Sequence, residues 1–338
     1  MRYSKVNKIS ISIDFVRGSI RKVPLSPEEI DTLLYSCRIP SALLHQPHAR
    51  VSLLQYSRFV TALMRASDDE LLGQAYQPLP MGSLSILAHW LVAAKTMGQV
   101  VHRLERFYQI MGKGMNIALE QDEDSFSLVI GNDYHPKEAD VFINEFSFFS
   151  IHRILCWLLK DIFPIQHLYF PFSAPPYAKD YRLMFYGAPV TFDSDRGRIV
   201  FPLQLLDKPV LQNQESLQHL LADPIGNFLV LNFYGESWSS KVGSMIQDKL
   251  QALPTLPELA AEMNLPPYTL QRRLAEEGVT YLSIKNQVKR DAAIERLVHT
   301  DLSIEEISSQ LGFSETSPFT RTFKDWTGVP PSAYRKRR

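Results

Sequence analysis

The sequence predicts a mixed α+β N-terminal domain followed by an all-α C-terminal domain with two helix-turn-helix units. Three observations lead to this fold class. The chain has 338 residues, more than one hydrophobic core usually organises, so two domains are expected. Helix and strand patterns alternate irregularly over residues 1–235. Over residues 236–338, helical segments follow one another without a strand pattern, so the boundary is predicted between these two ranges.

The N-terminal domain is predicted from alternating helix and strand signals. Its first helix has a defined start, because Ser26 suits the N-cap, Pro27 the first helical position and Glu29 the capping-box position. Apolar runs on either side of the acidic turn 121–124 are typical of paired strands. These signals, with apolar periodicity, predict helices at about 26–39, 53–64, 84–94, 98–112, 140–162, 179–186 and 213–234, the last either continuous or interrupted at 224–226. They predict strands at about 115–120, 125–130, 167–172, 190–192 and 198–201, the last two as a hairpin.

Composition argues against several classes of protein. Lys and Arg total 36, as do Asp and Glu, so net charge alone favours no partner. Cys37 and Cys156 lie far apart without a CxxC pair, which argues against a disulfide framework or zinc site. No HExxH, GxGxxG or Walker-type motif occurs, so we expect no metal, no cofactor and no enzymatic activity. Charged residues interrupt the apolar stretch 141–162, which predicts a buried helix and no membrane span. Two isolated cysteines suit a reducing compartment, so we expect a cytoplasmic protein.

The C-terminal domain contains one pattern twice. Residues 259–265 (LAAEMNL) and 270–274 (LQRRL) form the first copy. Residues 307–313 (ISSQLGF) and 319–323 (FTRTF) form the second. Each copy suits two short helices that cross steeply, with a residue of positive φ in the turn between them.

A strong helical pattern at about 281–298 separates the two predicted units, which span about 255–276 and 303–326. Seventeen residues or so at 1.5 Å each make a spacer of roughly 25 Å. Such a spacer can hold two reading helices in successive major grooves, about 34 Å apart on one face of DNA. The repeat therefore predicts a protein that binds double-stranded DNA over about two helical turns.

The second helix of each unit leaves one face for DNA. Arg272 and Arg321 occupy equivalent positions there, and arginine can donate two hydrogen bonds to guanine in the major groove. Arg273 and Lys324 are better placed to neutralise phosphates. Further candidates for base edges, thymine methyls and phosphates are Tyr268, Thr269, Gln271, Thr316, Ser317 and Thr320. The alternative interpretation is a helix bundle with solvated basic faces.

The stretch Leu311–Gly328 and its continuation to Arg335 resemble the second-unit signature of the AraC/XylS family of transcription regulators. Residues 269–274 (TLQRRL) are similar to the family's first reading helix. Within roughly residues 25–220, five segments resemble the OruR-like branch with an arabinose-binding-type N-terminal domain: 49–56, 82–87, 188–192, 198–201 and 205–209. The resemblance implies that residues 1–235 bind an effector or dimerise, and that residues 236–338 bind DNA.

The chain departs from the family pattern at two places. Relatives usually cap the first reading helix with Ser or Thr, where this chain has Pro266 and Pro267. Loss of a side-chain cap costs about 1 kcal/mol, although proline at the first helical position restores some order. Pro318 removes a backbone donor from the first turn of the second reading helix. The DNA contacts that the resemblance implies are therefore assigned more firmly to Arg321 than to Thr316 or Ser317.

These features predict a sequence-specific DNA-binding regulator, an activator by family tendency, which responds to a small effector and acts on RNA polymerase as a homodimer. Two alternatives remain. One is a constitutive regulator whose N-terminal domain only dimerises. The other is an enzyme fused to a DNA reader, which needs a reactive cysteine cluster that two isolated cysteines cannot supply. No pattern in the sequence encodes the effector, the operator or the sign of regulation.

The aromatic helix at 140–162 has two interpretations. Its residues Phe142, Phe146, Phe149 and Trp157 recur at helical spacing. Such a stripe is typical of ordinary core, but it can also form the wall of an apolar pocket. If an effector pocket exists, we expect it between this helix and the strands at 115–130.

Overall fold

The computed structural model describes residues 10–111, 115–132, 141–230 and 238–335. The chain divides into two compact units. We call them the helical unit (Met1–Asp14, Asp31–Tyr56 and Asn232–Arg338) and the sheet unit (Phe15–Ile30 and Ser57–Leu231). Neither unit is continuous in sequence, because two N-terminal stretches belong to the same unit as the C-terminal helices. The predicted boundary at residue 235 lies outside the described residues.

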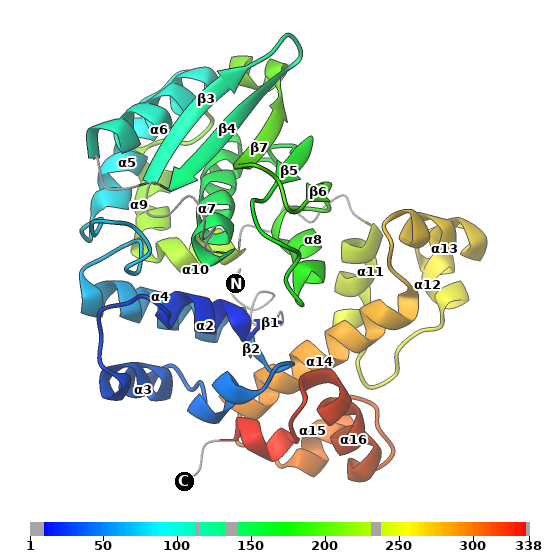
Figure 1. Ribbon diagram of the computed structural model, residues 1–338. Coiled ribbons are helices and arrows are strands. Elements are labelled where there is room, and N and C mark those ends of the chain that lie inside the picture. Colours follow the sequence, from blue (N-terminus) through cyan, green and yellow to red (C-terminus); the bar gives the residue numbers. More distant parts are fainter. Residues whose placement is uncertain (1–9, 112–114, 133–140, 231–237, 336–338) are drawn as a thin grey trace. The chain divides into compact units, whose positions relative to one another are not determined.

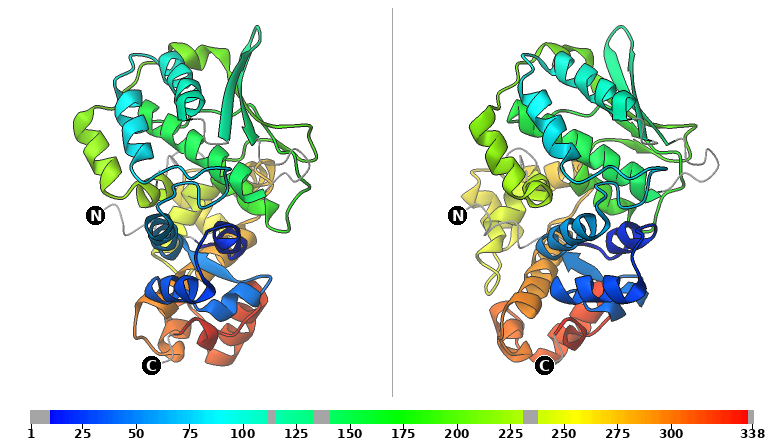
Figure 2. Two further views of the ribbon diagram at one scale, coloured as in Figure 1. Left: turned by 60° about the vertical axis from the view of Figure 1, so that its left-hand side comes forward. Right: turned by 90° about the vertical axis from the view of Figure 1, so that its left-hand side faces the viewer.

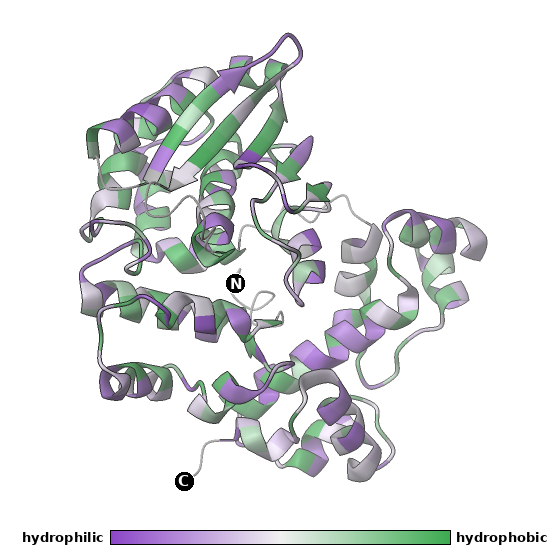
Figure 3. Cartoon of the chain, viewed as in Figure 1, coloured by the Kyte–Doolittle hydropathy of each residue, from purple (hydrophilic) through white to green (hydrophobic). Residues whose placement is uncertain are grey.

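The sheet unit is built on a five-stranded sheet with the order β3–β4–β7–β5–β6 (Figure 1). Neighbouring strands are antiparallel except β5 and β6, which are parallel. The turn between β3 and β4 is hydrophilic, whereas β4 is largely hydrophobic (Figure 3), because Phe126, Leu128 and Ile130 alternate toward the core. The strands are β3 (Met115–Gln121), β4 (Ser125–Asn132), β5 (His167–Tyr169), β6 (Val190–Thr191) and β7 (Gly197–Pro202).

The prediction of a hairpin between residues 190–192 and 198–201 is wrong. Strand β5 lies between β6 and β7, and Leu168 of β5 is the partner of Val190. The backbone N–H groups of Asp193 and Ser194 donate to carbonyl oxygens at Phe172 and Phe170. The turn after β6 therefore pairs with the segment that follows β5, and β6 and β7 are not neighbouring strands.

Helices cover one face of this sheet (Figure 2). α6 packs against β3, and α7 packs against β4. The helices whose residues fall wholly or partly in this unit are α2 (Asp14–Ile20), α3 (Pro27–Ser36), α4 (Leu53–Ser67), α5 (Ser83–Val92), α6 (Met97–Met111), α7 (Val141–Leu159), α8 (Tyr181–Met184), α9 (Gln214–Ala222) and α10 (Pro224–Val230), with 3₁₀ turns η2 (Ala178–Asp180) and η3 (Leu203–Asp207).

α7 is the central helix of the sheet unit. By length and composition alone it could cross a membrane, but most of it is buried inside the protein, as expected for a core helix. Phe142 and Trp157 are buried, which favours the core interpretation of its aromatic stripe. Burial lowers the pKa of His152 to about 3 and raises that of Cys156 to about 11, so both side chains are neutral near pH 7.

The helical unit contains the predicted pair of helix-turn-helix motifs. α14 runs between the helix pairs α12–α13 and α15–α16 (Figure 1), and α11 packs on both α13 and α14. The prediction of an all-α C-terminal region with two such motifs is confirmed. The elements are β1 (Ser10–Ser12), η1 (Ser41–His45), β2 (Arg50–Ser52), α11 (Trp238–Gln247), α12 (Leu256–Glu262), α13 (Pro267–Glu276), α14 (Tyr281–His299), α15 (Ile304–Gln310), α16 (Thr316–Thr327) and η4 (Pro331–Tyr334).

Candidate nucleic-acid interface

The first motif, α12 and α13, is held by a capped start and a tight turn. Thr255 accepts from the Glu258 N–H, and Glu258 accepts from the Thr255 N–H, which forms a capping box. Asn264 adopts a φ of 56° in the turn, and the Leu265 N–H donates to the Ala260 oxygen at 2.9 Å. An aliphatic cluster then joins α12 and α13 to α11 and α14, with members Val242, Ile246, Leu259, Ala260, Leu270, Leu274 and Ile284.

The second motif, α15 and α16, repeats this construction with different residues. Ser303 and Glu306 form the capping box of α15. Gly312 adopts a φ of 71° in the turn, and the Phe313 N–H donates to the Ser308 oxygen at 3.1 Å. The support is aromatic here: Phe319 and Phe323 of α16 are fully buried and contact each other, and Phe313 meets Phe319 edge-on.

The exposed face of α13 carries most of the predicted first-motif residues. Tyr268 is 73% exposed, and Gln271 and Arg272 are also exposed. Thr269 is half-buried. The Arg272 Nε lies 3.5 Å from the Glu276 Oε1 one turn along the helix, an exposed ion pair of the kind that contributes little to stability. The arginine therefore remains available to a ligand.

The exposed face of α16 carries the matching set. Ser317, Arg321 and Lys324 are exposed, whereas Thr316 and Thr320 are half-buried. Arg321 and Lys324 project from the face opposite to Phe319 and Phe323, because residues three and four apart share a side of a helix. The structure thus leaves an arginine exposed at the equivalent position of both second helices.

Arg273 lies differently from the other predicted residues. Its guanidinium carbon is 4.5 Å from the ring centroid of Trp238 on α11, and its Nε is buried without a hydrogen-bond partner among the described residues. Sequence reasoning missed this stacking, because Trp238 is thirty-five positions away in the chain and no local pattern links the two.

Two lysines of α14 lie between the motifs, and sequence reasoning did not place them in the interface. The Lys289 ammonium is 4.7 Å from the ring centroid of Phe313 in the second motif, and the Lys285 ammonium is 5.4 Å from that of Tyr281. Burial, with a smaller contribution from Lys285, lowers the pKa of Lys289. The available signal was the spacing of Lys285 and Lys289, four residues apart on one side of α14.

The two second helices begin without a side-chain cap. The N-cap residues are Pro266 for α13 and Glu315 for α16, and neither side chain accepts a hydrogen bond from the helix. The predicted departure from a Ser or Thr cap therefore holds for α13, and Pro267 occupies its first turn. In the second motif, the Ser308 hydroxyl instead donates to the Glu315 carbonyl oxygen at 3.0 Å, which fixes the chain where α16 begins.

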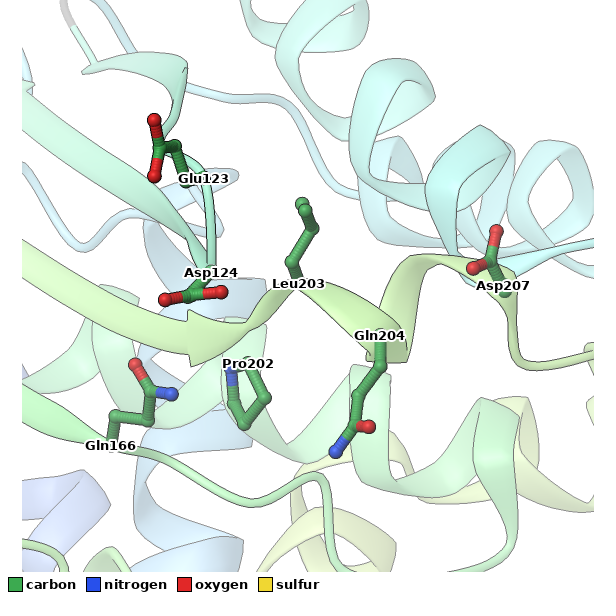
Figure 4. Close-up of a pocket in the computed structure, with 7 residues that line it drawn as sticks. All are labelled: Glu123, Asp124, Gln166, Pro202, Leu203, Gln204 and Asp207. Carbon is green, nitrogen blue, oxygen red and sulfur yellow. The ribbon is translucent and has the colours of Figure 1, made fainter.

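The sheet unit has a hollow on its surface (Figure 4). It lies at the β3–β4 turn and η3, away from the predicted position between α7 and strands 115–130. Within the described residues, no group of three or more His, Cys, Asp or Glu side chains is arranged to hold a metal ion. The residues that line the hollow are Glu123, Asp124, Gln166, Pro202, Leu203, Gln204 and Asp207.

Two family models match this sequence. Residues 29–210, more than half of the chain, match the arabinose-binding domain found at the N-terminus of AraC transcription regulators. Residues 259–337 match a helix-turn-helix domain model, and this range includes both motifs. The chain belongs to the AraC family of transcription regulators. This AraC-family protein is accordingly a DNA-binding transcription regulator and not an enzyme.

Similar proteins include transcription regulators of Pseudomonas aeruginosa. The ornithine utilization regulator of Pseudomonas aeruginosa is 24% identical over 307 residues, 90% of each chain. The transcriptional regulator VqsM of the same organism is 26% identical over 199 residues, 55% of this chain and 57% of VqsM. Among solved structures, the transcriptional regulator CdpR of Pseudomonas aeruginosa is 20% identical over 91% of this chain and 96% of its own, with a TM-score of 0.34.

Proposed function

We propose that this AraC-family protein reads one contiguous operator with α13 and α16 together. The observation that carries the proposal is that α13 and α16 lie in one helical unit with α14, and each exposes an arginine at the equivalent position, Arg272 or Arg321. α16 packs against α14 directly, whereas α13 packs against α11 and shares an aliphatic cluster with Ile284 of α14. α14 has 19 residues and is therefore roughly 28 Å long, close to the separation of successive major grooves. Two reading helices so separated suit a site of about two turns.

In this proposal the exposed residues divide into two roles. Arg272 and Arg321 donate bidentate hydrogen bonds to guanines. Lys324 and Arg273 neutralise phosphates, which for Arg273 requires the side chain to leave the Trp238 ring. The remaining polar and aromatic groups contact base edges, thymine methyls and phosphates: Tyr268, Thr269, Gln271, Thr316, Ser317 and Thr320.

The sheet unit would act as the sensor. It contains most of the range that matches the arabinose-binding domain model, so we propose that it binds a small effector and biases DNA binding or dimerisation in the other unit. We further propose that the protein acts in the cytoplasm as a homodimer. It would activate transcription by contacting RNA polymerase, which is the tendency of the family. The name of one relative makes ornithine the first effector to test.

Arg321→Ala tests the reading role. We expect specific operator affinity to fall by about 1–3 kcal/mol, roughly 5- to 150-fold, with relaxed preference at a single base pair. Fluorescence anisotropy on the operator and on its single-base variants measures both. Lys249→Ala is the matched control, because Lys249 is an exposed cation of the helical unit that pairs with Glu262 instead of facing from α13 or α16. Unchanged affinity and unchanged base preference in Arg321→Ala would refute the assignment.

A thermal-shift titration tests the sensing role. A ligand that binds only the folded state raises the unfolding temperature progressively with its concentration. Ornithine and other small metabolites are added to the full-length protein, and operator affinity is measured with any compound that stabilises it. A constitutive regulator would show neither stabilisation nor a change in DNA affinity across the whole set.

A further inference from the structure

The N-terminal ribbon of the helical unit is formed by β1 and β2, which pair antiparallel with Ser10 opposite Ser52 and Ser12 opposite Arg50. All six residues of the two strands are buried. Two strands of three residues cannot be stable alone in water. The ribbon is stabilised by its contact with α14, which lies in the same compact unit although it is more than 200 residues away in the sequence.

A chain of polar groups joins the ribbon to α14. The Arg50 Nε donates to the Ser10 hydroxyl oxygen at 3.0 Å, and the Ser10 hydroxyl donates to the Asp291 Oδ1 at 2.5 Å. The Arg290 Nε donates to the same carboxylate oxygen at 3.0 Å. Arg50, Ser10 and Asp291 are all at least 94% buried. Removal of one member leaves a buried charge or polar atom without its partner, which is strongly destabilising for the local arrangement.

A second connection leads from the ribbon to α16. The Arg50 backbone N–H donates to the Tyr334 hydroxyl oxygen at 3.0 Å. The Tyr334 ring is buried and meets Phe323 of α16 edge-on, with centroids 5.3 Å apart. Burial raises the pKa of Tyr334 to about 12, so the hydroxyl stays neutral and this contact persists across the physiological pH range.

A third connection ends at the last turn of α14. The Arg38 Nη1 donates to the Val298 carbonyl oxygen at 3.0 Å, a favourable place for a cation because the C-terminal carbonyls of a helix carry partial negative charge. The Gln55 Nε2 in turn donates to the Arg38 carbonyl oxygen at 2.5 Å. We call residues 10–14 and 31–56 of the helical unit the N-terminal segment. The N-terminal segment contacts α14 at two places, Asp291 and Val298, and η4 at a third, Tyr334.

We propose that the N-terminal segment positions the second helix-turn-helix motif, with Ser10 and Arg50 acting as positioning residues for α16 through Asp291 and Tyr334. The segment would act as a part of the DNA-reading unit although it lies at the opposite end of the chain. The first motif draws its support from α11 instead, through Val242 and Ile246. The two reading helices therefore depend on different parts of the sequence: α13 on the neighbouring α11, and α16 on the N-terminal ribbon.

The test uses full-length protein with Ser10→Ala, Asp291→Asn and the double variant. We expect each single variant to lose about 10-fold in operator affinity, and nuclease protection to weaken over the half-site read by α16 while the half-site read by α13 stays protected. The double variant should lose less than the product of the two single losses, because the two residues form one network. Lys249→Ala, which breaks an exposed ion pair in the same unit, should retain both halves.

Amide hydrogen exchange on the DNA-free variants gives a second readout that does not depend on operator binding. Ser10→Ala should accelerate exchange in α16 and η4 but leave α13 at the wild-type rate. Equal acceleration in α13 and α16, or no change in either, would overturn the proposal, as would uniform weakening of both half-sites. A wild-type protein without any footprint would count against the proposed operator reading, and the exchange pattern would still decide the role of the ribbon.

Discussion

Each helix-turn-helix motif exposes an arginine at the equivalent position of its second helix, but the two motifs have different hydrophobic cores. The first rests on aliphatic side chains such as Leu270 and Leu274, whereas the second rests on Phe319 and Phe323. Both keep a left-handed residue in the turn and a capping box at the start of the first helix. The turn and the cap therefore set the orientation of the reading helix in both motifs, and different apolar side chains of sufficient volume can fill the core beneath it.

The core difference predicts the largest effect. Phe319→Ala and Leu270→Ala remove equivalent, fully buried side chains. We expect Phe319→Ala to lower the free energy of unfolding by about 3–5 kcal/mol and Leu270→Ala by about 2–5 kcal/mol, from lost burial and the remaining cavity. Denaturant titration of the helical unit's transition in the full-length protein measures both. A loss below about 1 kcal/mol at either site would show that the surrounding side chains can collapse into the space.

The turn residues predict the next largest effect and separate the motifs more sharply. Gly312 has a φ of 71°, and a Cβ there would lie 2.5 Å from the Gln251 carbonyl oxygen. Gly312→Ala should therefore destabilise by roughly 2–4 kcal/mol, since left-handed strain adds to a backbone overlap. Asn264, with a φ of 56°, is exposed, so Asn264→Gly should change stability by less than about 1 kcal/mol. Similar losses at both turns would mean that the Gln251 contact does not restrict the second motif.

Most of the structure that the two motifs share is predictable from the sequence. Both motifs and the connecting helix follow from apolar periodicity, and the capping box at Ser303 is visible as Ser followed three residues later by Glu306. These signals are local. The fold class of the N-terminal half follows as well, because α7 and the β3–β4 pair are long enough for their patterns to be unambiguous.

Features that depend on distant contacts could not be predicted. β1 and β2 have three residues each, too few to show a period, and their buried Arg50 and Ser10 look like surface residues in the sequence. The predicted hairpin of β6 and β7 was wrong because β5 lies between them in the sheet. A short separation in sequence does not prevent a third strand from pairing between two strands. Arg273 is placed by Trp238, a choice of rotamer that no local pattern encodes.

The connection between the two helices of each motif predicts a smaller effect. In the second motif the buried Ser308 hydroxyl donates to the Glu315 carbonyl oxygen, whereas the first motif has Ala260 at this position. Ser308→Ala should destabilise by about 1–2 kcal/mol, because it leaves a carbonyl without its partner. Thermal unfolding of Ser308→Ala beside the exposed control Ser309→Ala measures the difference. An equal effect of the two substitutions would contradict a role for this bond.

The capping boxes predict the smallest effect, and there the two motifs should behave alike. Backbone N–H donors at Thr255 and Ser303 lower the pKa of Glu258 and Glu306 below the usual value of 4.5. Because the folded-state pKa is lowered, each carboxylate stabilises its helix above about pH 4.5 and loses that contribution as the pH falls through the lowered value.

Glu258→Gln and Glu306→Gln isolate this pH dependence. Glutamine still accepts the backbone hydrogen bond but carries no charge, so its capping contribution does not titrate. The difference in unfolding temperature between wild type and each variant should therefore be positive at pH 6 and shrink toward pH 3, by a similar amount for both variants. A difference that stays constant with pH would show that neither carboxylate acts through its charge. A difference that shrinks for one variant alone would show that the shared cap does not make the two motifs equivalent.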